Sequence, residues 1–561
     1  MSELRLDVPR WTLADSLVKE RAPETVILLY AALLSVFYNT AFWRYLGSIT
    51  DLQSGRGLVL IFSVFILLTG FFSFFIGLLP FRWCARVFLS VLLPVSALAS
   101  YFMNQYGIPI DGRMIQNVFE TNTAEAVDLF TWKLLVYLLV LGVAPVAILW
   151  RLPIRFESSW WLRLRRRALF ILLALVALFV VIGGQYQYMA SVARNNKEIR
   201  YFIVPNNVIK GLVDYGKEVG GFKSLEKSGK PAVMAADARR GSSWVGRSRK
   251  SLFVLVLGET ARAANFGLNG YERNTTPELT TEKELINLSQ MRSCGTDTAV
   301  SLPCMMSGLG RSDYSLSKAR GRENLLDAVQ RAGLRVVWID NQSGCKRVCD
   351  RVENIMTSSR NDSRFCEDGE CHDGILVDEL HKLSAGLDQD TLLVLHQMGS
   401  HGPAYFKRYP ADFARFQPDC RSAQLDKCSR DEIQNAYDNT ILYTDHVLSG
   451  LIDVLRGASG HLDTGLFYLS DHGESLGELG LYLHGAPYVF APDVQTHVPS
   501  VLWLSEGLQK ARGVSASCMA GKSGTALSQD NLFDSILGIM DVQTKIYRPA
   551  LDMFHGCTKP A

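Results

Sequence analysis

Residues 251–260 read SLFVLVLGET, a continuous apolar run that ends on a glycine followed by a carboxylate. Further short apolar runs occur at 334–340, 391–397, 465–470 and 497–504. Amphipathic stretches lie between them, as at 322–332 and 431–456. Apolar runs of strand length that alternate with helical stretches predict a mostly parallel sheet covered on both faces. We therefore expect an α/β domain over residues 251–561.

Chemically reactive side chains follow three of these strands. The first strand ends in Glu259, the third continues through His396 to His401, and the fourth is followed by Asp471 and His472. In parallel sheets, functional groups collect where the carboxyl ends of the strands meet. Carboxylate and imidazole ligands together suit Zn²⁺, whereas Mg²⁺ prefers oxygen ligands and water. An Asp-His pair alone is most often part of an ordinary loop, but its position at a strand end that matches Glu259 favours a zinc site.

A candidate nucleophile lies between the first two strands, in the segment Cys294-Gly-Thr-Asp-Thr-Ala-Val-Ser-Leu-Pro-Cys304. Thr298 lies where a helix is expected to begin, and a helix N-terminus stabilises anions and a developing alkoxide. A free threonine hydroxyl is a poor nucleophile at neutral pH, and binding to Zn²⁺ would lower its pKa. The alternative is that Thr296 and Thr298 only cap the helix, which is the commoner role of threonine at such a position.

The first 190 residues contain five apolar segments, and each has about the 20 residues that a membrane-spanning helix needs. These segments are 24–46, 57–79, 84–103, 132–150 and 168–188. A buried helical core is the alternative, but core helices seldom extend for about 20 residues without a charge. We expect a five-helix transmembrane bundle over residues 1–190, a linker with an interfacial helix over 191–250, and the soluble domain over 251–561.

Basic residues in the loops predict the orientation of this bundle. The N-terminal tail, the loop after the second segment and the loop after the fourth are rich in Arg and Lys. The last of these loops carries Arg151, Arg155, Arg163, Arg165, Arg166 and Arg167. The N-terminus is therefore expected to be cytoplasmic, and five crossings place the residues after 190 outside. A charged tail before the first segment also disfavours a cleaved signal peptide.

The cysteines agree with an extracytoplasmic domain, because ten of the 11 follow residue 290 and only Cys84 falls within the predicted bundle. An even number of closely spaced cysteines is typical of disulfides in an oxidising compartment. The expected pairs are Cys294–Cys304, Cys345–Cys349, Cys366–Cys371, Cys420–Cys428 and Cys518–Cys557. A cysteine-rich zinc site is the alternative, but no pair has the C-x2-C spacing of a zinc knuckle.

Composition excludes two broad classes of protein. The chain has 58 Lys and Arg against 55 Asp and Glu, and a net charge of +3 argues against a nucleic-acid binder that relies on global charge. Hydrophobic residues make up 48% of the chain, too many for a wholly disordered protein.

Six groups of residues share a pattern with a known family. They are Gly258-Glu259-Thr260-Ala261-Arg262, Asn269-Gly270-Tyr271, the segment from Cys294 to Cys304, His396-Gln-Met-Gly-Ser-His401-Gly-Pro, Asp471-His-Gly-Glu-Ser-Leu-Gly477, and His484-Gly485. With the five apolar segments, they resemble the bacterial phosphoethanolamine transferases that modify lipid A, including the mobile colistin-resistance enzymes. The resemblance extends over nearly the whole chain and implies an α/β/α sandwich of the alkaline-phosphatase and sulfatase type.

The resemblance also implies roles for individual residues. The implied metal ligands are Glu259, Thr298, Asp471 and His472. Thr298 corresponds to the zinc-bound nucleophile that becomes covalently modified, and no role is attached to Asp297. His401 and His484 correspond to histidines near the substrate phosphate, where they could move protons. The implied cofactor is one tightly bound Zn²⁺, with a possible additional zinc at His401 and His484.

A loop between apolar segments, residues 104–131, carries further candidates. Asn117, Thr121 and Glu125 recur every four residues, which predicts that they lie along one helical face. Periodicity alone supports only a solvated amphipathic helix. The resemblance implies that these residues line the site of the donor lipid and that Glu125 holds the ethanolamine ammonium. By the same resemblance, Ser343 and Lys346 are candidate phosphate contacts.

These predictions together indicate an expected function. The chain should transfer phosphoethanolamine from phosphatidylethanolamine to a phosphate of lipid A or lipopolysaccharide, through a covalent threonine intermediate, and so confer polymyxin and colistin resistance. We expect a monomeric multi-pass protein of the bacterial inner membrane, surrounded by membrane lipids, with its catalytic domain in the periplasm and no nucleic-acid partner.

Three alternatives stay open at this point. The first is the same chemistry on an inner-core sugar or a periplasmic glucan. The second is a membrane-tethered phosphatase, sulfatase-like hydrolase or phosphoglycerol transferase on the same catalytic fold. The third is a non-catalytic surface protein that uses zinc only for folding.

Overall fold

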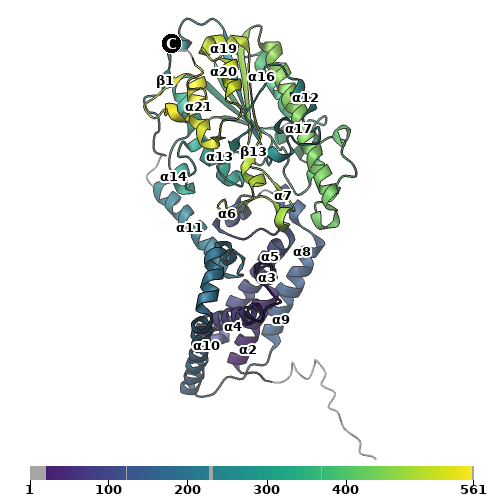
Figure 1. Cartoon of the computed structure of the whole chain (residues 1–561). Helices are drawn as coiled ribbons and strands as arrows, with labels where there is room; N and C mark the ends of the chain where they lie inside the picture. Colours follow the sequence, from purple (N-terminus) through teal and green to yellow (C-terminus); the bar gives the residue numbers. More distant parts are fainter. Residues whose placement is uncertain (1–19, 122, 227–230, 368, 559–561) are drawn as a thin grey trace, which may run out of the picture. The chain divides into compact units, whose positions relative to one another are not determined.

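The computed structural model describes residues 20–121, 123–226, 231–367 and 369–558 (Figure 1). These residues form two compact units. The helical unit contains the described residues up to Asp111 together with Phe130–Lys210, and the sheet unit contains Gly112–Leu129 and the described residues from Gly211 onward. The segment Gly112–Leu129 therefore belongs to the sheet unit, although apolar helices precede and follow it in the sequence. The domain boundaries at 190 and 250 stay a prediction.

The helical unit contains the long apolar helices that the sequence predicts. Four described helices are long and apolar enough to cross a membrane: α4 (Gly55–Leu78), Trp83–Tyr106, Trp132–Arg151 and α10 (Trp160–Asn195). A fifth span results if α2 (Pro23–Phe37) and α3 (Thr40–Ser48), which bend by 54° at their junction, are one crossing. Two spans contain π-helical turns, with η1 (Phe81–Ala85) before α5 (Arg86–Tyr106) and η2 (Leu138–Val143) between α8 (Trp132–Tyr137) and α9 (Ala144–Arg151). The predicted bundle of apolar helices is confirmed.

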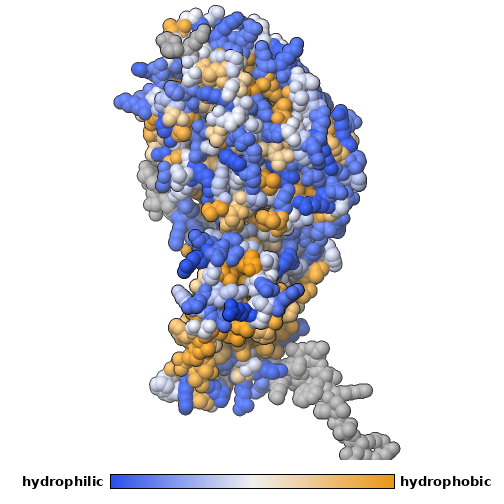
Figure 2. Space-filling view, in the orientation of Figure 1, coloured by the Kyte–Doolittle hydropathy of each residue, from blue (hydrophilic) through white to orange (hydrophobic). Residues whose placement is uncertain are grey.

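The surface of the helical unit is unusually apolar, as Figure 2 shows. Phe62, Phe179 and Val180 are about 70% exposed, at 69%, 71% and 68%. Helix α10 is the extreme case, because Ala174 is the one buried residue among its 36. Such a helix would expose a large apolar area to water, and a hydrocarbon surrounding removes that cost.

One detail of the N-terminal prediction is wrong. The last span was expected at 168–188, with Arg163 and Arg165–Arg167 in the preceding loop, but α10 already begins at Trp160 and continues to Asn195. Backbone hydrogen bonds and helix-forming arginines extend a helix beyond the apolar core that hydropathy detects. The expected surface helix near 200–216 is α11 (Asn206–Glu226), which follows the short 3₁₀ helix η3 (Lys197–Phe202).

The sheet unit is built on a seven-stranded sheet of order β3-β14-β10-β2-β9-β5-β6. Its strands are β3 (Ile286–Asn287), β14 (Ser500–Leu504), β10 (Leu462–Ser470), β2 (Lys250–Gly258), β9 (Thr391–His396), β5 (Arg335–Asp340) and β6 (Glu353–Met356). The five strands from β10 to β6 run parallel, whereas β14 is antiparallel to β10 and to β3. The mostly parallel sheet was predicted.

The predicted strand at 497–504 is divided in two. Its first part, β13 (His497–Val498), pairs with β4 (Met291–Arg292) in a separate small sheet that β15 (Leu527–Ser528) completes. Its second part is β14 of the main sheet. Pro499 separates the two parts, and a proline cannot donate the backbone hydrogen bond that a continuous strand requires.

Alternate residues of β2 enter two separate cores, one on each face of the sheet. Phe253, Leu255 and Leu257 pack with one cluster, which includes residues of α13, α15 and α21. Leu252 and Val254 pack with the other, which includes residues of α16 and α17. Figure 1 shows the helices on both sides of the sheet. Burial of both faces explains why the strands are continuously apolar rather than alternating.

The sheet unit also contains helices and two-stranded ribbons. Its helices are α6 (Gly112–Glu120), α7 (Thr123–Leu129), α12 (Pro277–Thr281), α13 (Thr298–Ser307), α14 (Leu316–Arg320), α15 (Leu325–Arg331), α16 (Gly374–Ala385), α17 (Arg430–Ala458), α18 (Asp493–Thr496), α19 (Glu506–Arg512), α20 (Ala516–Gly521) and α21 (Leu532–Ile539). Its two-stranded ribbons are β1 (Arg239–Arg240) with β16 (Val542–Gln543), β7 (Cys366–Glu367) with β8 (Glu370–Cys371), and β11 (Ser475–Leu476) with β12 (Tyr482–Leu483). Within the predicted linker 191–250, Trp244 packs on the sheet unit, since it is buried and its indole donates to the carbonyl of Met540 at 2.8 Å.

Five disulfides join ten cysteines of the sheet unit. They are Cys294–Cys304, Cys345–Cys349, Cys366–Cys371, Cys420–Cys428 and Cys518–Cys557, the same five pairs that the sequence predicts. Among the described residues, Cys84 of the helical unit is the free cysteine. Because the ten sulfurs are bonded in pairs, none is a thiolate that could hold zinc, and the cysteine-rich zinc site is excluded.

Candidate metal centre

Glu259 follows β2 at the carboxyl edge of the sheet, in a turn of unusual backbone geometry. Thr260 has a φ of 53°, and Gly399, which follows β9, has a φ of 55°. A Cβ at Gly399 would lie 2.6 Å from the carbonyl oxygen of Glu259. The carbonyl of Glu259 also accepts from the amide of Ser400 at 3.0 Å. Glycine at 399 thus permits the close approach that holds Glu259 in position.

Asp471 and His472 follow the adjacent strand, β10, at the same edge. The amide of Asp471 donates to Gly258 at 2.9 Å, and its Oδ1 accepts from the amides of His472 at 2.7 Å and Thr260 at 3.2 Å. Nδ1 of His472 lies 3.0 Å from the carbonyl oxygen of Gly473. This contact assigns the ring proton to Nδ1, so that the lone pair of Nε2 is directed toward Asp471 and Glu259.

Thr298 is the first residue of α13 and contacts both sides of this group. Its Oγ1 lies 3.0 Å from Oε2 of Glu259 and 3.2 Å from Nε2 of His472. Asp297 is the N-cap and accepts from the amide of Val300 at 3.0 Å. The hydroxyl therefore lies at a capped helix N-terminus, where the positive end of the helix dipole stabilises an alkoxide. The capping role itself belongs to Asp297, which leaves the hydroxyl of Thr298 directed at Glu259 and His472.

The chemistry of this donor set fits a divalent cation. One ligand atom each from Glu259, Asp471 and His472 lie within 4.8 Å of one another, and all three side chains are buried. Oδ2 of Asp471 is inaccessible to solvent and makes no hydrogen bond within the described part of the chain. Burial and the neighbouring Asp471 raise the pKa of Glu259 well above its ordinary value. A bound cation would give Oδ2 of Asp471 a partner and would offset the repulsion between the carboxylates of Glu259 and Asp471. Mixed nitrogen and oxygen ligands suit Zn²⁺.

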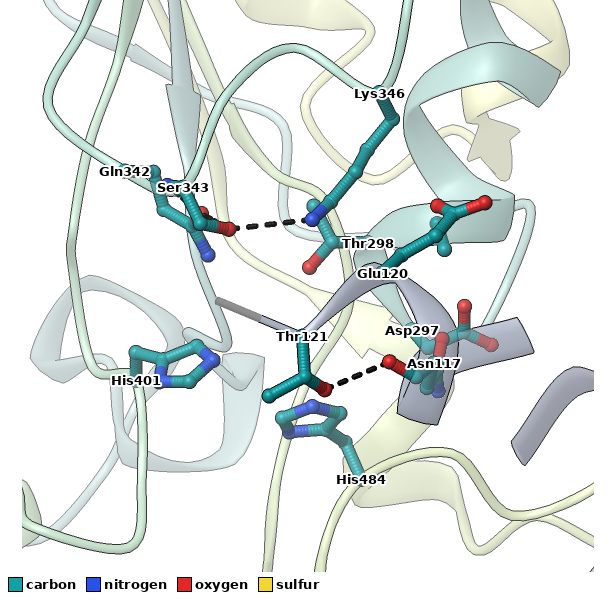
Figure 3. A pocket seen from close by; sticks show the side chains of 11 residues that line it. Asn117, Glu120, Thr121, Asp297, Thr298, Gln342, Ser343, Lys346, His401 and His484 are labelled. Atoms are coloured by element: carbon teal, nitrogen blue, oxygen red, sulfur yellow. Dashed lines mark hydrogen bonds between the residues drawn. The ribbon is translucent and has the colours of Figure 1, made fainter. Parts of the chain in front are cut away.

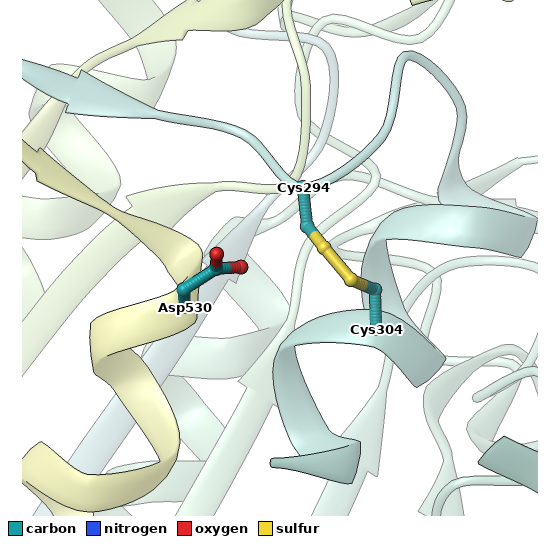
Figure 4. A group of neighbouring side chains, drawn as sticks. All are labelled: Cys294, Cys304 and Asp530. Atoms are coloured by element: carbon teal, nitrogen blue, oxygen red, sulfur yellow. A yellow bond between two sulfur atoms is a disulfide. The ribbon is translucent and has the colours of Figure 1, made fainter. Parts of the chain in front are cut away.

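A second group of possible ligands does not form a metal site. Cys294, Cys304 and Asp530 lie together in Figure 4, but the two sulfurs form a disulfide. Oδ1 of Asp530 accepts from the amide of Arg311 at 2.9 Å. This group therefore joins α13 to the segment before α21. It contributes to the position of α13 and has no free thiolate.

A small polar pocket of about 50 Å³ opens beside Thr298 (Figure 3). It is lined by Asn117, Glu120, Thr121, Asp297, Thr298, Ala299, Gln342, Ser343, Lys346, His401 and His484. Nζ of Lys346 donates to Oγ of Ser343 at 3.2 Å, and both side chains are directed into the pocket. Six of the seven predicted substrate-binding residues are thus brought together. The seventh, Glu125, lies in α7, and its side chain is outside the described part of the structure.

The expectation of one helical face through Asn117, Thr121 and Glu125 is wrong. Helix α6 ends at Glu120 and α7 begins at Thr123, so Glu125 lies on a separate helix. The amide and hydroxyl of Thr121 bond to the carbonyl of Asn117 at 2.8 and 2.7 Å, which keeps these two residues one turn apart. Threonine often ends a helix in this way, because its hydroxyl competes for backbone hydrogen bonds.

The sequence prediction missed three residues of the site. Glu120 lines the pocket and pairs with Arg320 at 2.6 Å. Nε2 of Gln342 donates to Oε2 of Glu259 at 3.2 Å. Glu474 is fully buried, and its carboxylate accepts from Nδ1 of His484 at 2.8 Å. Two of them could have been found, because Gln342 follows strand 334–340 directly and Glu474 lies three residues after Asp471.

His401 and His484 face one another, with ring centroids 5.8 Å apart, and the ring of His472 lies 4.5 Å from that of His484. Burial lowers the pKa of His401 well below its ordinary value, and Arg408 adds to this effect. Nε of Arg408 donates to the carbonyl of His401 at 2.9 Å. The imidazole of His401 is therefore neutral at pH 7 and has a lone pair for a proton or a cation.

Comparisons with known proteins agree with the two-unit architecture. A model of the sulfatase family matches residues 251–542, and one described as phosphoethanolamine transferase EptA/EptB matches residues 68–219. Phosphoethanolamine transferase EptA of Escherichia coli K12 is 37% identical over 535 residues, which are 95% of this chain and 96% of the relative. Phosphatidylethanolamine transferase Mcr-2 of Escherichia coli is 35% identical over 93% of this chain and 95% of its own length.

A solved structure resembles nearly the whole chain. It is the integral membrane protein lipooligosaccharide phosphoethanolamine transferase A of Neisseria meningitidis, with a TM-score of 0.90 and 34% sequence identity. The match covers 97% of this chain and 100% of the solved one. Both the apolar helices and the sheet unit therefore have counterparts in one integral membrane protein.

Proposed function

Because the chain belongs to the phosphoethanolamine transferase family, we propose that it moves phosphoethanolamine from phosphatidylethanolamine to a phosphate of lipid A, with Thr298 as covalent carrier. One observation carries the proposal: the Thr298 hydroxyl lies 3.0 Å from Glu259 and 3.2 Å from His472, which converge with Asp471. These four residues would hold the zinc ion. Zinc bound there lowers the pKa of the hydroxyl and offsets charge on phosphoryl oxygens.

The transfer divides into two displacements at phosphorus. In the first, Oγ of Thr298 forms a bond to the phosphorus of phosphatidylethanolamine while the bond from phosphorus to the diacylglycerol oxygen breaks. The hydroxyl proton passes to His401 or His484 and from there to the leaving diacylglycerol. In the second, a hydroxyl oxygen of a lipid A phosphate attacks the same phosphorus, and the threonine oxygen leaves and takes up the proton that this hydroxyl loses. Imidazoles at the rim are suited to both transfers.

The pocket supplies groups that match the phosphate of phosphoethanolamine. Lys346 and Ser343 are positioned by their mutual hydrogen bond to contact phosphoryl oxygens. Asn117 and Thr121 line the opposite wall. Glu125 is proposed to hold the ethanolamine ammonium, since an ammonium group in a partly dry site needs a carboxylate partner.

We further propose that the chain lies in the bacterial inner membrane as a monomer, with its sheet unit in the periplasm. The apolar helices, the basic loops and the five disulfides support this placement. Donor and acceptor are both lipids, so membrane anchoring confines their encounter to a surface. Addition of an ammonium to lipid A lowers its net negative charge, which is expected to reduce polymyxin affinity.

The experiment that tests the proposal compares Thr298→Ala with Thr298→Ser. Labelled phosphatidylethanolamine is supplied to the full-length proteins, and the intact protein and lipid A are analysed by mass spectrometry. The native chain should acquire a phosphoethanolamine adduct and pass it to lipid A, Thr298→Ser should retain part of both signals, and Thr298→Ala should lose both. Full activity of Thr298→Ala would refute the nucleophile. Release of free phosphoethanolamine would identify a hydrolase, and label on another sugar a different acceptor.

A further inference from the structure

The helical unit has a cavity of about 360 Å³ at the end where α2 and α10 begin and α4 is followed by Pro80. All residues that line it belong to the helical unit, so its shape depends on that unit alone. By the positive-inside rule, this end of the bundle faces the cytoplasm. None of the residues that line it lines the pocket beside Thr298, and the proposed function does not use it.

Charged side chains of the cavity are mostly arginines. They are Arg155, Arg163, Arg166, Arg167, Glu24 and Glu157. Four arginines against two glutamates leave a formal surplus of two positive charges. Arg166 is paired with Glu157. Nη1 of Arg167 is inaccessible to solvent and makes no hydrogen bond within the described residues. A buried guanidinium nitrogen without an acceptor is costly, and an anion in the cavity would supply one.

Apolar side chains lie among these arginines. Trp160 and Leu164, which line the cavity, are 56% and 52% exposed. The ring of Trp160 stacks on that of Trp161 with centroids 4.1 Å apart. Exposed tryptophans beside arginines are typical of the boundary between hydrocarbon and headgroups. The cavity therefore offers a phosphate-binding interior at the depth where lipid headgroups lie.

We infer that this cavity binds the phosphate headgroup of an anionic glycerophospholipid of the cytoplasmic leaflet. One guanidinium group can donate two parallel hydrogen bonds to two oxygens of a phosphate. Basic pockets between membrane helices therefore suit anionic headgroups. A zwitterionic headgroup fits less well, because its ammonium would meet the surplus of positive charge. The positive-inside rule accounts for arginines at this end of the bundle, but it does not require that four of them line one cavity or that an Nη1 atom is buried without a hydrogen bond.

The chain contains a matched control for this inference. Arg165 lies on the same helix between Arg163 and Arg166 and is exposed, but it does not line the cavity. Arg163→Gln, Arg167→Gln and Arg165→Gln each remove one positive charge from the same helix. A variant whose melting temperature changes in the absence of lipid is not used to measure binding. Replacement of Arg163 is least expected to disturb folding, because Arg163 is exposed.

The full-length protein in nonionic detergent is titrated with short-chain phosphatidylglycerol, short-chain phosphatidylethanolamine or inorganic phosphate. Thermal unfolding and native mass spectrometry report binding. Phosphatidylglycerol should bind and raise the melting temperature of the native chain and Arg165→Gln. Its apparent affinity should fall about tenfold in Arg163→Gln and Arg167→Gln, as expected for the loss of one charge-assisted hydrogen bond.

Three results would overturn the inference. Equal loss of affinity in all three variants would show general attraction to a basic surface, and equal binding of phosphatidylethanolamine would remove the role of net charge. Binding of inorganic phosphate as tight as that of phosphatidylglycerol would mean that a free anion, not a lipid, is the ligand. None of these outcomes bears on Thr298, so failure here leaves the proposed function untouched.

Discussion

The hydroxyl oxygen of Thr298 lies 3.0 Å from Oε2 of Glu259, although the two residues are 39 positions apart. Glu259 follows a central strand and Thr298 opens a helix, so two different elements deliver the two oxygen atoms to one point. The carboxylate is fully buried there beside Asp471. Two buried carboxylates repel each other unless a cation lies between them. The following predictions start from this relationship.

Replacement of Glu259 by Gln should remove zinc and activity while stabilising the zinc-free protein. The amide keeps the shape of the side chain but removes the charge that Asp471 repels, so the metal-free melting temperature should rise. Loss of a ligand should lower zinc affinity by more than the roughly 10–100-fold expected for an outer partner. Gln342→Ala, which removes such a partner, is the comparison. Metal analysis and thermal unfolding measure both effects, and normal zinc content in Glu259→Gln would contradict the site.

Removal of metal should abolish transfer but leave the fold of the sheet unit intact. Two large cores and five disulfides stabilise this unit independently of the proposed ion. A chelator should therefore stop product formation with little change in far-ultraviolet circular dichroism, and Zn²⁺ but not Mg²⁺ should restore activity. Unfolding upon chelation, or a zinc-loaded protein without turnover, would instead favour a purely structural metal.

Glu474→Gln should slow transfer because Glu474 positions His484. Its carboxylate accepts from Nδ1 of His484 at 2.8 Å and from the hydroxyl of Tyr405 at 2.6 Å. An amide cannot accept both bonds equally well, and loss of such an orienting partner typically costs about 10–100-fold. Tyr405→Phe removes only the second bond and should have a smaller effect on kcat. If Tyr405→Phe were as slow as Glu474→Gln, orientation of His484 would not be the cause.

Gly399→Ala should destabilise the protein and weaken metal binding together. A residue other than glycine is strained at the φ of 55°, and the new Cβ would lie 2.6 Å from the carbonyl oxygen of Glu259. The expected loss of stability is about 1–3 kcal/mol. Gly386→Ala is the control, because its φ is −111° and no atom lies within 4 Å of the added carbon. Comparable zinc content and melting temperature in the two variants would disprove this role of Gly399.

Stability should decrease in mild acid because His401 is buried in its neutral form. Burial and Arg408 hold its pKa well below the ordinary value, whereas the unfolded chain gains a proton below a pH of about 6.5. His401 therefore destabilises the fold as pH falls from about 6.5 toward its folded pKa, by about 1.4 kcal/mol per pH unit. Thermal unfolding at several pH values should show a shallower slope in His401→Gln. Parallel slopes would contradict the prediction.

Much of the site could be predicted because its residues occupy the ends of strands. The apolar run 251–258 predicts a strand. The residues that follow parallel strands meet at the carboxyl edge of the sheet, independently of the conformation of the loops. Glu259, Asp471 and His472 were therefore identifiable before any contact was known. The same holds for the apolar helices, because about 20 uncharged residues are a local property of the chain.

Other features depend on contacts that local patterns do not contain. The break between α6 and α7, the early start of α10 and the division of residues 497–504 by Pro499 are boundaries, which small hydrogen-bonding differences decide. No sequence pattern indicates a functional role for Glu474, other than its position three residues after Asp471. Its role became visible only when His484, ten residues later, was found within 2.8 Å.

By itself, the sequence determined the two kinds of structural unit, a set of apolar helices and a sheet that is buried on both faces. The length and the periodicity of the apolar segments indicate which side chains are buried. The sequence also determined the pairing of nearby cysteines, since short loops bring them within reach. Tertiary structure alone decided how closely Thr298 approaches Glu259 and His472, that the segment 112–129 belongs to the sheet unit, and that arginines of α10 line a cavity. Convergence requires long-range packing of both cores, and no local pattern encodes a distance between side chains that are far apart in the chain.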